Sequence, residues 1–218
     1  LAWTVRVVAL VVGGLAVMFN QRAPGISLLI ASAAGGIALA SLAWNGHGAM
    51  DEGSQRYWHF ITDILHLLAA GAWLGALIAF ALLARINSLQ SEERIRLLVR
   101  AVKRFEWVGA VIVVVITVTG IVNYLFIVGP ELDEVFLSTY GILLFIKVGL
   151  FAGMLVLAAL NRFQLGPLLE RSLRDRQYRV AANALRRSVV VEWVAAVLIV
   201  GLVAWLGTLS PEMEVSAE

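Results

Sequence analysis

The chain alternates between long apolar stretches and short polar segments, and this pattern predicts a bundle of transmembrane helices. Six stretches approach the roughly 20 residues that a helix needs to cross a bilayer. They are residues 1–19, 25–44, 57–85, 105–128, 138–161 and 188–209. Their periodicity is not that of barrel strands, so helices are the spanning elements that fit. We therefore expect an all-α, polytopic fold in which residues 1–218 form a single transmembrane domain.

Charges in the connecting segments predict the orientation of the spans. The segments 86–104 and 162–187 are rich in Arg and Lys, and the positive-inside rule assigns them to the cytoplasm. The segment 129–137 has three acids and no Lys or Arg, and the C-terminal tail is also acidic. Alternation then places the segment 45–56 and both termini outside. Arg6, at the outer end of the first span, is the one mild conflict.

The two basic segments also carry helical patterns. SEERIRLLVRAVKRF begins with a serine that can cap a helix, followed by acids in the first turn and basic residues later. LLERSLRDRQYRVAANALRR is similarly periodic. We expect both to form helical extensions near the lipid headgroups.

Composition supports a membrane protein and narrows its chemistry. Hydrophobic residues make up 61% of the chain and charged residues 15%, against about 25% in soluble proteins. Mean hydropathy is +0.87. The basic residues are concentrated in particular loops, where they report topology. Since the net charge is only +2, nucleic acid is not an expected partner. There is no cysteine, so a metal would be held by His, Met, carboxylate or backbone oxygen.

All three histidines of the chain lie within residues 44–75. On a helix, His59, Asp63 and His66 are spaced i, i+4, i+7 and share one face. His47 and Met50 precede them in the outer segment. Alone, His47 and His59 are ordinary exposed or interfacial residues, whereas His66 inside a span needs a hydrogen-bond partner or a ligand. The clustering favours a metal site; His with Met suits Cu(I), and imidazole with carboxylate suits Cu(II) or zinc.

Clustered histidines in a membrane protein can also bind haem or relay protons. A haem inside a bundle takes axial ligands from opposite sides of its ring, normally from different helices. His59 and His66 share one face of one helix, and the other spans have no histidine, so no haem is expected. A proton relay through His59, Asp63 and His66 is the remaining alternative.

Four ionisable groups lie within or just inside the spans. They are Asp63, Glu106, Lys147 and Glu192. Placing one such charge unpaired in the bilayer would cost roughly 3 kcal/mol, so each group needs an ion-pair partner, contact with water, or a neutral protonation state. For Glu106 and Glu192 we expect pairing with adjacent arginines. Lys147 either pairs with Asp63 or places a positive charge beneath the metal site as a gate. The fourth span carries polar residues that helix packing explains, with a polar lining near the histidines as the alternative: Thr117, Thr119, Asn123 and Tyr124.

Four blocks resemble the copper-resistance protein D family in sequence and in order. They are HLLAAGAWLGAL (66–77), TYGILLFIKVGLF (139–151), LNRFQLGPLL (160–169) and LRRSVVVEW…LGTLSP (185–211). The positions that carry over are His66, Trp73, Gly75, Tyr140, Lys147, Asn161, Arg162, Arg186, Arg187, Glu192 and Pro211. Only His66 among them is an obvious metal ligand. Members usually have about eight spans, so either N-terminal spans are missing or this is a short member.

The resemblance implies a bacterial inner-membrane protein that works with a periplasmic CopC-like copper carrier and moves copper across the membrane, with inward transport as the expected direction. We expect His47, Met50 and His59 to capture copper at the outer mouth. Asp63 and His66 would form the deeper site. No nucleotide-binding loop or enzymatic activity is expected, and homo-oligomerisation is left open. The alternatives are a non-transporting docking or sensing subunit and a membrane redox protein.

Overall fold

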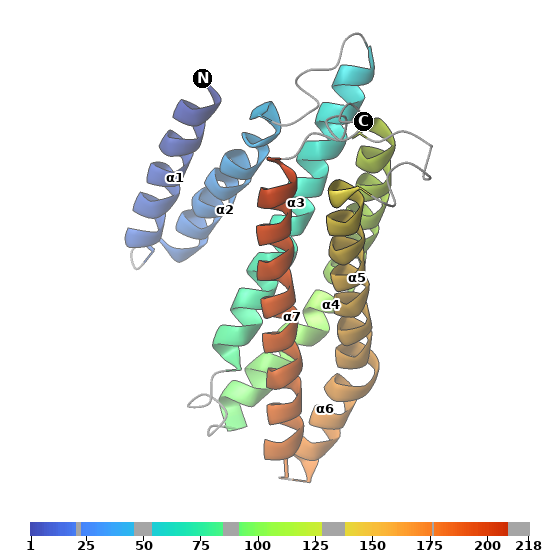
Figure 1. The fold of residues 1–218 in the computed structure, drawn as a ribbon. Helices are drawn as coiled ribbons and strands as arrows, with labels where there is room; N and C mark the ends of the chain where they lie inside the picture. Colours follow the sequence, from blue (N-terminus) through green and yellow to red (C-terminus); the bar gives the residue numbers. More distant parts are fainter. Residues whose placement is uncertain (21–22, 46–53, 85–91, 128–137, 176, 209–218) are drawn as a thin grey trace. The chain divides into compact units, whose positions relative to one another are not determined.

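The computed structural model describes residues 1–20, 23–45, 54–84, 92–127, 138–175 and 177–208. Within these residues the regular structure is entirely helical, which confirms the all-α prediction (Figure 1). The elements are α1 (Ala2–Met18), α2 (Pro24–Ala40), the short 3₁₀ turn η1 (Ala43–Asn45), α3 (Ser54–Leu83), α4 (Glu92–Ile127), α5 (Thr139–Leu160), the π-helical turn η4 (Asn161–Leu165), α6 (Gly166–Arg174) and α7 (Arg179–Leu206).

Each of the six predicted spans corresponds to an apolar helix. Among the described residues, four helical segments are long and apolar enough to cross a membrane: 57–83, 93–127, 139–174 and 179–206. The apolar helices α1 and α2 have 17 residues each, at the short end of what a bilayer requires. The basic segments are largely helical, as expected, since α4 already begins at Glu92 and α7 at Arg179.

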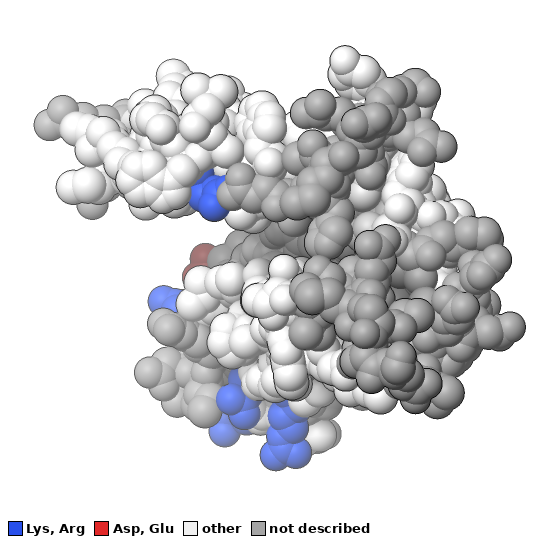
Figure 2. Space-filling view, turned by 45° about the horizontal axis from the view of Figure 1, so that its top comes forward, with Lys and Arg blue, Asp and Glu red and all other residues white. Residues whose placement is uncertain are grey.

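The surfaces of these helices match a lipid environment. In the four long segments, no more than 17% of the most apolar window is buried inside the protein. The exposed side chains are instead large and apolar, as Val111, Val114 and Val118 on α4 illustrate. On the face drawn in Figure 2, most of the described surface carries neither basic nor acidic side chains. A soluble protein rarely exposes apolar surface of this extent.

The chain divides into two compact units, and α3 and α4 contribute to both. The first unit consists of residues 1–72 and 112–129. In it α1 and α2 lie side by side (Figure 1). They approach closely at Gly13, where a Cβ atom would lie 3.3 Å from the Cβ of Ala34. A small residue at such a crossing lets two membrane helices come into contact along their backbones.

Arg6 has a local partner that explains its place in the first span. Its Nε donates a hydrogen bond to Ser41 Oγ at 3.1 Å, and its terminal nitrogen donates to the Ser41 carbonyl at 3.3 Å. Ser41 is fully buried and forms the C-cap of α2. A cation is stabilised at a helix C-terminus by the helix dipole. Arg6 therefore contributes to the packing of α1 against α2, which explains a basic residue at the outer end of the first span.

The second unit consists of residues 73–111 and 130–218. Its core joins the first turns of α4 to α6 and α7 through Ile95, Leu98, Leu169 and Leu185, each no more than 1% exposed. α5 and α7 lie side by side in the same unit (Figure 1). The core thus lies among helical extensions that hydropathy alone assigns to loops.

The ion pair on the surface of this core should contribute little to stability. Lys103 Nζ lies 3.7 Å from Glu170 Oε2, and the two side chains are 67% and 46% exposed. Exposed pairs of this kind contribute about 0–1 kcal/mol. We expect Lys103→Ala to leave the thermal unfolding temperature of the detergent-solubilised protein nearly unchanged. A large drop would show that the lysine supports the core in another way.

Candidate functional site

The histidine-bearing part of α3 lies antiparallel to the last part of α4 within the first unit. Three contacts join them at matched helical intervals. The ring of His59 stacks on Phe126 with centroids 5.0 Å apart and planes 20° apart. The hydroxyl of Thr62 donates to Asn123 Oδ1 at 2.8 Å. One turn further, His66 Nδ1 lies 3.0 Å from Thr119 Oγ1.

The hydrogen bonds of Thr119 determine which nitrogen of His66 carries the proton. The Thr119 hydroxyl donates its single proton to the Val115 carbonyl, with the oxygens 2.5 Å apart. If that proton stays directed at the Val115 carbonyl, the hydroxyl oxygen accepts toward His66 and Nδ1 of His66 is the donor. In the neutral ring Nε2 consequently carries the lone pair. Histidines that bind metal characteristically use one nitrogen as the ligand and donate from the other.

The backbone next to Thr119 leaves room for the imidazole. At Gly120 a Cβ atom would lie 3.5 Å from Cε1 and 3.8 Å from Nδ1 of His66. Those are ordinary contacts, so alanine fits there, but a longer side chain would press on the ring. Thr119 is 5% exposed and His66 half-buried. The ring is therefore held between a hydrogen bond and a close backbone surface.

The predicted common face of the histidines is confirmed, because His59 and His66 both contact α4. His59 is only 3% exposed, although a capture residue at the mouth was expected to be accessible. Asp63 is half-buried on the same helix. Among the described residues, these three included, no three His, Asp or Glu side chains gather closely enough to hold one metal ion.

The other predicted site residues are distributed over both units. His47 and Met50 lie outside the described residues. Lys147, on α5, is half-buried and belongs to the second unit, whereas Asp63 belongs to the first. Pairing between Lys147 and Asp63 stays a prediction, as does a gating role. Glu106 is half-buried on α4 of the second unit.

Glu192 has an amide partner where the sequence predicts an arginine. It is 2% exposed, and its Oε1 accepts a hydrogen bond from Asn161 Nδ2. Asn161 opens the π-helical turn η4, and the amide of Gly166 donates to its carbonyl to close that turn. Pro167, which cannot donate a backbone hydrogen bond, follows at the start of α6. The wide turn ahead of the proline brings Asn161 to α7.

Sequence reasoning identified the histidines but not what holds them. Thr62 and Gly120 carried no signal of their own. Thr119 and Asn123 were recognised as polar, with packing and lining left as alternatives; both form hydrogen bonds between α3 and α4, as packing predicts, and a lining role stays a prediction. Thr117 is exposed and donates only to the Val113 carbonyl of its own helix. The one usable signal was spacing, because Thr119 and Asn123 are four residues apart and share a face.

The apolar helices and their polar α3–α4 contacts define a multi-pass membrane protein. A family model described as "Copper resistance protein D" matches residues 99–206, and one described as "Copper resistance protein D-like, N-terminal domain" matches residues 1–58. Copper resistance protein D of Pseudomonas syringae pv. tomato is 54% identical over 213 residues, which cover 98% of this chain and 69% of that protein. The chain therefore belongs to the copper resistance protein D family.

Two more distant relatives extend the comparison. Inner membrane protein YebZ of Escherichia coli (strain K12) is 28% identical over 207 residues, or 94% of this chain and 66% of the relative. Copper transport protein CutJ of Bacillus subtilis (strain 168) is 30% identical over 164 residues, or 75% of this chain and 27% of the relative. No solved structure matches the chain. The family confirms the resemblance noted in the sequence, and it is a copper-resistance family rather than an enzyme family.

Proposed function

We propose that this protein binds copper at the outer face of the bacterial inner membrane and moves it inward, with copper as the transported substrate. The observation that carries the proposal is the hydrogen bond between His66 and Thr119 inside a spanning helix, which is compatible with a neutral imidazole that donates from Nδ1 and offers Nε2 to a metal. Family membership supports copper as the metal. The names of two relatives, "Copper resistance protein D" and "Copper transport protein CutJ", point the same way.

The residues divide into two groups along the proposed path. His47 and Met50 take copper from the periplasmic side, and Asp63 and His66 pass it into the membrane. His59 was predicted to join the capture group, but it is 3% exposed and stacks on Phe126, so it is left out of that group here. A neutral imidazole and a thioether suit Cu(I), and an imidazole with a carboxylate suits Cu(II). With no cysteine in the chain, no thiolate competes for the ion. Lys147, which belongs to the second unit, modulates the passage of the cation.

The charge pattern supports the orientation of the site, and the inward direction is taken from the resemblance to the family. The basic segments lie in the cytoplasm by the positive-inside rule, so the histidine stretch opens to the periplasm. A CopC-like periplasmic carrier would deliver copper there. The alternative is a docking or sensing subunit that binds copper only at its outer segment. A membrane redox protein is the other alternative.

Reconstitution separates these functions. Purified protein is placed in vesicles that enclose a copper-sensitive fluorophore, and copper is added outside with or without a loaded carrier. We expect copper to enter several-fold faster than in empty vesicles. Binding without entry would favour the docking subunit, and a haem Soret band in the absorbance spectrum would favour the redox protein. Either result would overturn the proposal.

A further inference from the structure

A carboxyl group lies buried on α7, inside the second unit, and pairs with an amide. Glu192 is 2% exposed, and its Oε1 accepts a hydrogen bond from Asn161 Nδ2. In the part of the chain that the structure describes, no lysine or arginine forms an ion pair with this carboxyl group. An ionised carboxylate is costly inside a membrane helix unless a cation or water compensates its charge. The buried site therefore favours the neutral form of the acid.

The amide group of Asn161 has a second polar atom that the neutral acid would satisfy. Its Oδ1 is buried and receives no hydrogen bond from the described residues. A carboxylate cannot donate to it, whereas a carboxylic acid donates from its hydroxyl and accepts at its carbonyl oxygen. With a proton on Oε2, Glu192 would form two hydrogen bonds to Asn161: Nδ2 to Oε1, and Oε2–H to Oδ1. The buried oxygen would then have its partner.

The π-helical turn η4 holds Asn161 against α7. The amide of Gly166 donates to the Asn161 carbonyl and closes the turn. A Cβ atom at Gly166 would lie 3.0 Å from that carbonyl oxygen, so a larger residue would press on the turn. Turns of this kind within a helical segment often mark functional sites. The position of the amide is thus fixed by the backbone on both sides of it.

A buried hydroxyl extends the polar site toward the start of α7. Ser188 lies one turn before Glu192 on the same face and is 9% exposed. Its Oγ is buried without a hydrogen-bond partner among the described residues. A hydroxyl can accept one proton and donate another. Since α7 begins at Arg179, in a segment that the positive-inside rule assigns to the cytoplasm, Ser188 offers a step toward that side.

The cations on α7, η4 and α5 are placed away from the carboxyl group. On α7, Arg186 and Arg187 precede Glu192 by six and five positions, so neither shares its face. The guanidinium of Arg162, on η4, lies over the aromatic ring of the next residue, 5.3 Å from the ring centroid. Lys147 lies about 20 Å along α5 from the π-helical turn. None of these four side chains therefore neutralises Glu192.

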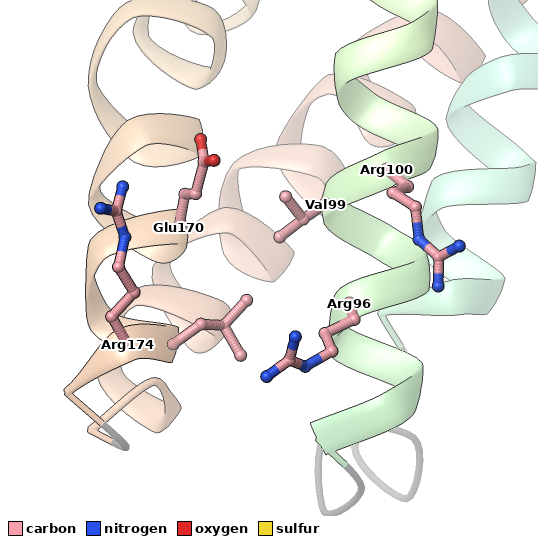
Figure 3. Close-up of a pocket in the computed structure, with 6 residues that line it drawn as sticks. Arg96, Val99, Arg100, Glu170 and Arg174 are labelled. Atoms are coloured by element: carbon pink, nitrogen blue, oxygen red, sulfur yellow. The ribbon is translucent and has the colours of Figure 1, made fainter.

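The helices α4 and α6, which share a core with α7, also carry acids. Glu170 lies on α6, across a pocket from the first turns of α4 (Figure 3), and 3.7 Å from Lys103. Glu93 is exposed at the start of α4. Glu106 is half-buried on α4 and, like Glu192, directly precedes a tryptophan. Glu106 is thus the acid with which Glu192 has to be compared.

We propose that Glu192 and Asn161 form a proton-binding site, and that Glu192 releases and rebinds its proton as copper crosses the membrane. The O–H bond of the acid breaks, the proton passes by way of the Ser188 hydroxyl to water on the cytoplasmic side, and a carboxylate remains until it is protonated again. Ionisable groups inside membrane helices commonly serve proton pathways. The coupling to copper rests on the proposed function, whereas the proton site itself does not.

Infrared spectroscopy of the purified protein, without copper and at neutral pH, tests the site. We expect a C=O stretching band of a protonated carboxylic acid that is lost in Glu192→Gln. The matched control Glu106→Gln should keep this band. Asn161→Leu removes the donor to Oε1, so the same band should move to higher frequency. Absence of the band from the unmodified protein, or its loss in Glu106→Gln instead, would overturn the site, and the first result requires no variant to fold.

The coupling is tested in the copper-entry vesicles with an imposed pH gradient. The gradient should change the rate of copper entry several-fold in the unmodified protein and in Glu106→Gln, but not in Glu192→Gln. A gradient without effect on the unmodified protein would overturn the coupling. If no copper entered at all, the proposed function would be wrong, and the infrared band would still decide whether Glu192 binds a proton.

Discussion

Replacing His66 with alanine is expected to abolish copper transport while the protein remains folded. Loss of a residue that supports a metal ligand typically costs 10–100-fold in affinity, so loss of the ligand itself should cost more than about 100-fold. His66 is half-buried on a helix and alanine favours helix formation, so folding should tolerate the change. The measurement is copper entry into reconstituted vesicles, together with copper bound per protein.

A neighbouring substitution controls for damage to the helix. Leu65 is exposed one position before His66, and Leu65→Ala should retain both binding and transport. Circular dichroism and a single symmetric gel-filtration peak establish that both variants are folded. If His66→Ala transported copper at the unmodified rate, the assignment of the deep site would be wrong. Transport lost with binding intact would instead make His66 a residue of the path that is not needed for capture.

The sequence predicts the bounds of the apolar spans more closely than the bounds of the helices that continue beyond them. Apolar runs located the spans to within a few residues, since α5 covers Thr139–Leu160 where 138–161 was predicted. α4 is different, because its helix starts at Glu92 while its apolar run starts near residue 105. Hydropathy reports contact with lipid, not helix formation. The charged first turns are helical because Ile95 and Leu98 are buried against α6 and α7.

The arrangement of the site could be predicted only in part, for a related reason. Helical periodicity puts His59 and His66 on one face, but it cannot identify the helix that this face meets. His66 and Thr119 are 53 residues apart in sequence, and Thr62 and Asn123 are 61 apart. The same holds for Asn161 and Glu192, whose contact depends on a π-helical turn. These pairings depend on packing between helices, which no local pattern encodes.

The role of Thr119 provides the sharpest test of how His66 is held. Thr119→Val keeps the shape of the side chain but removes the hydroxyl oxygen that accepts from Nδ1. The imidazole then has no fixed tautomer from this side, and we expect copper affinity to fall by about 10–100-fold. Thr119→Ser restores the acceptor and should stay within a few-fold of the unmodified protein. Copper titration of both variants in detergent gives the two affinities.

The pair of variants also separates orientation from packing. Thr119 is almost fully buried, so a valine there preserves the volume of the side chain, whereas serine loses the methyl group. If packing alone mattered, serine would be the worse substitution and valine nearly neutral. If the hydroxyl orients the ring, the order is reversed, because serine alone can receive the Nδ1 proton. Equal copper affinities for the unmodified protein, Thr119→Val and Thr119→Ser would mean that copper binding does not depend on the tautomer of His66.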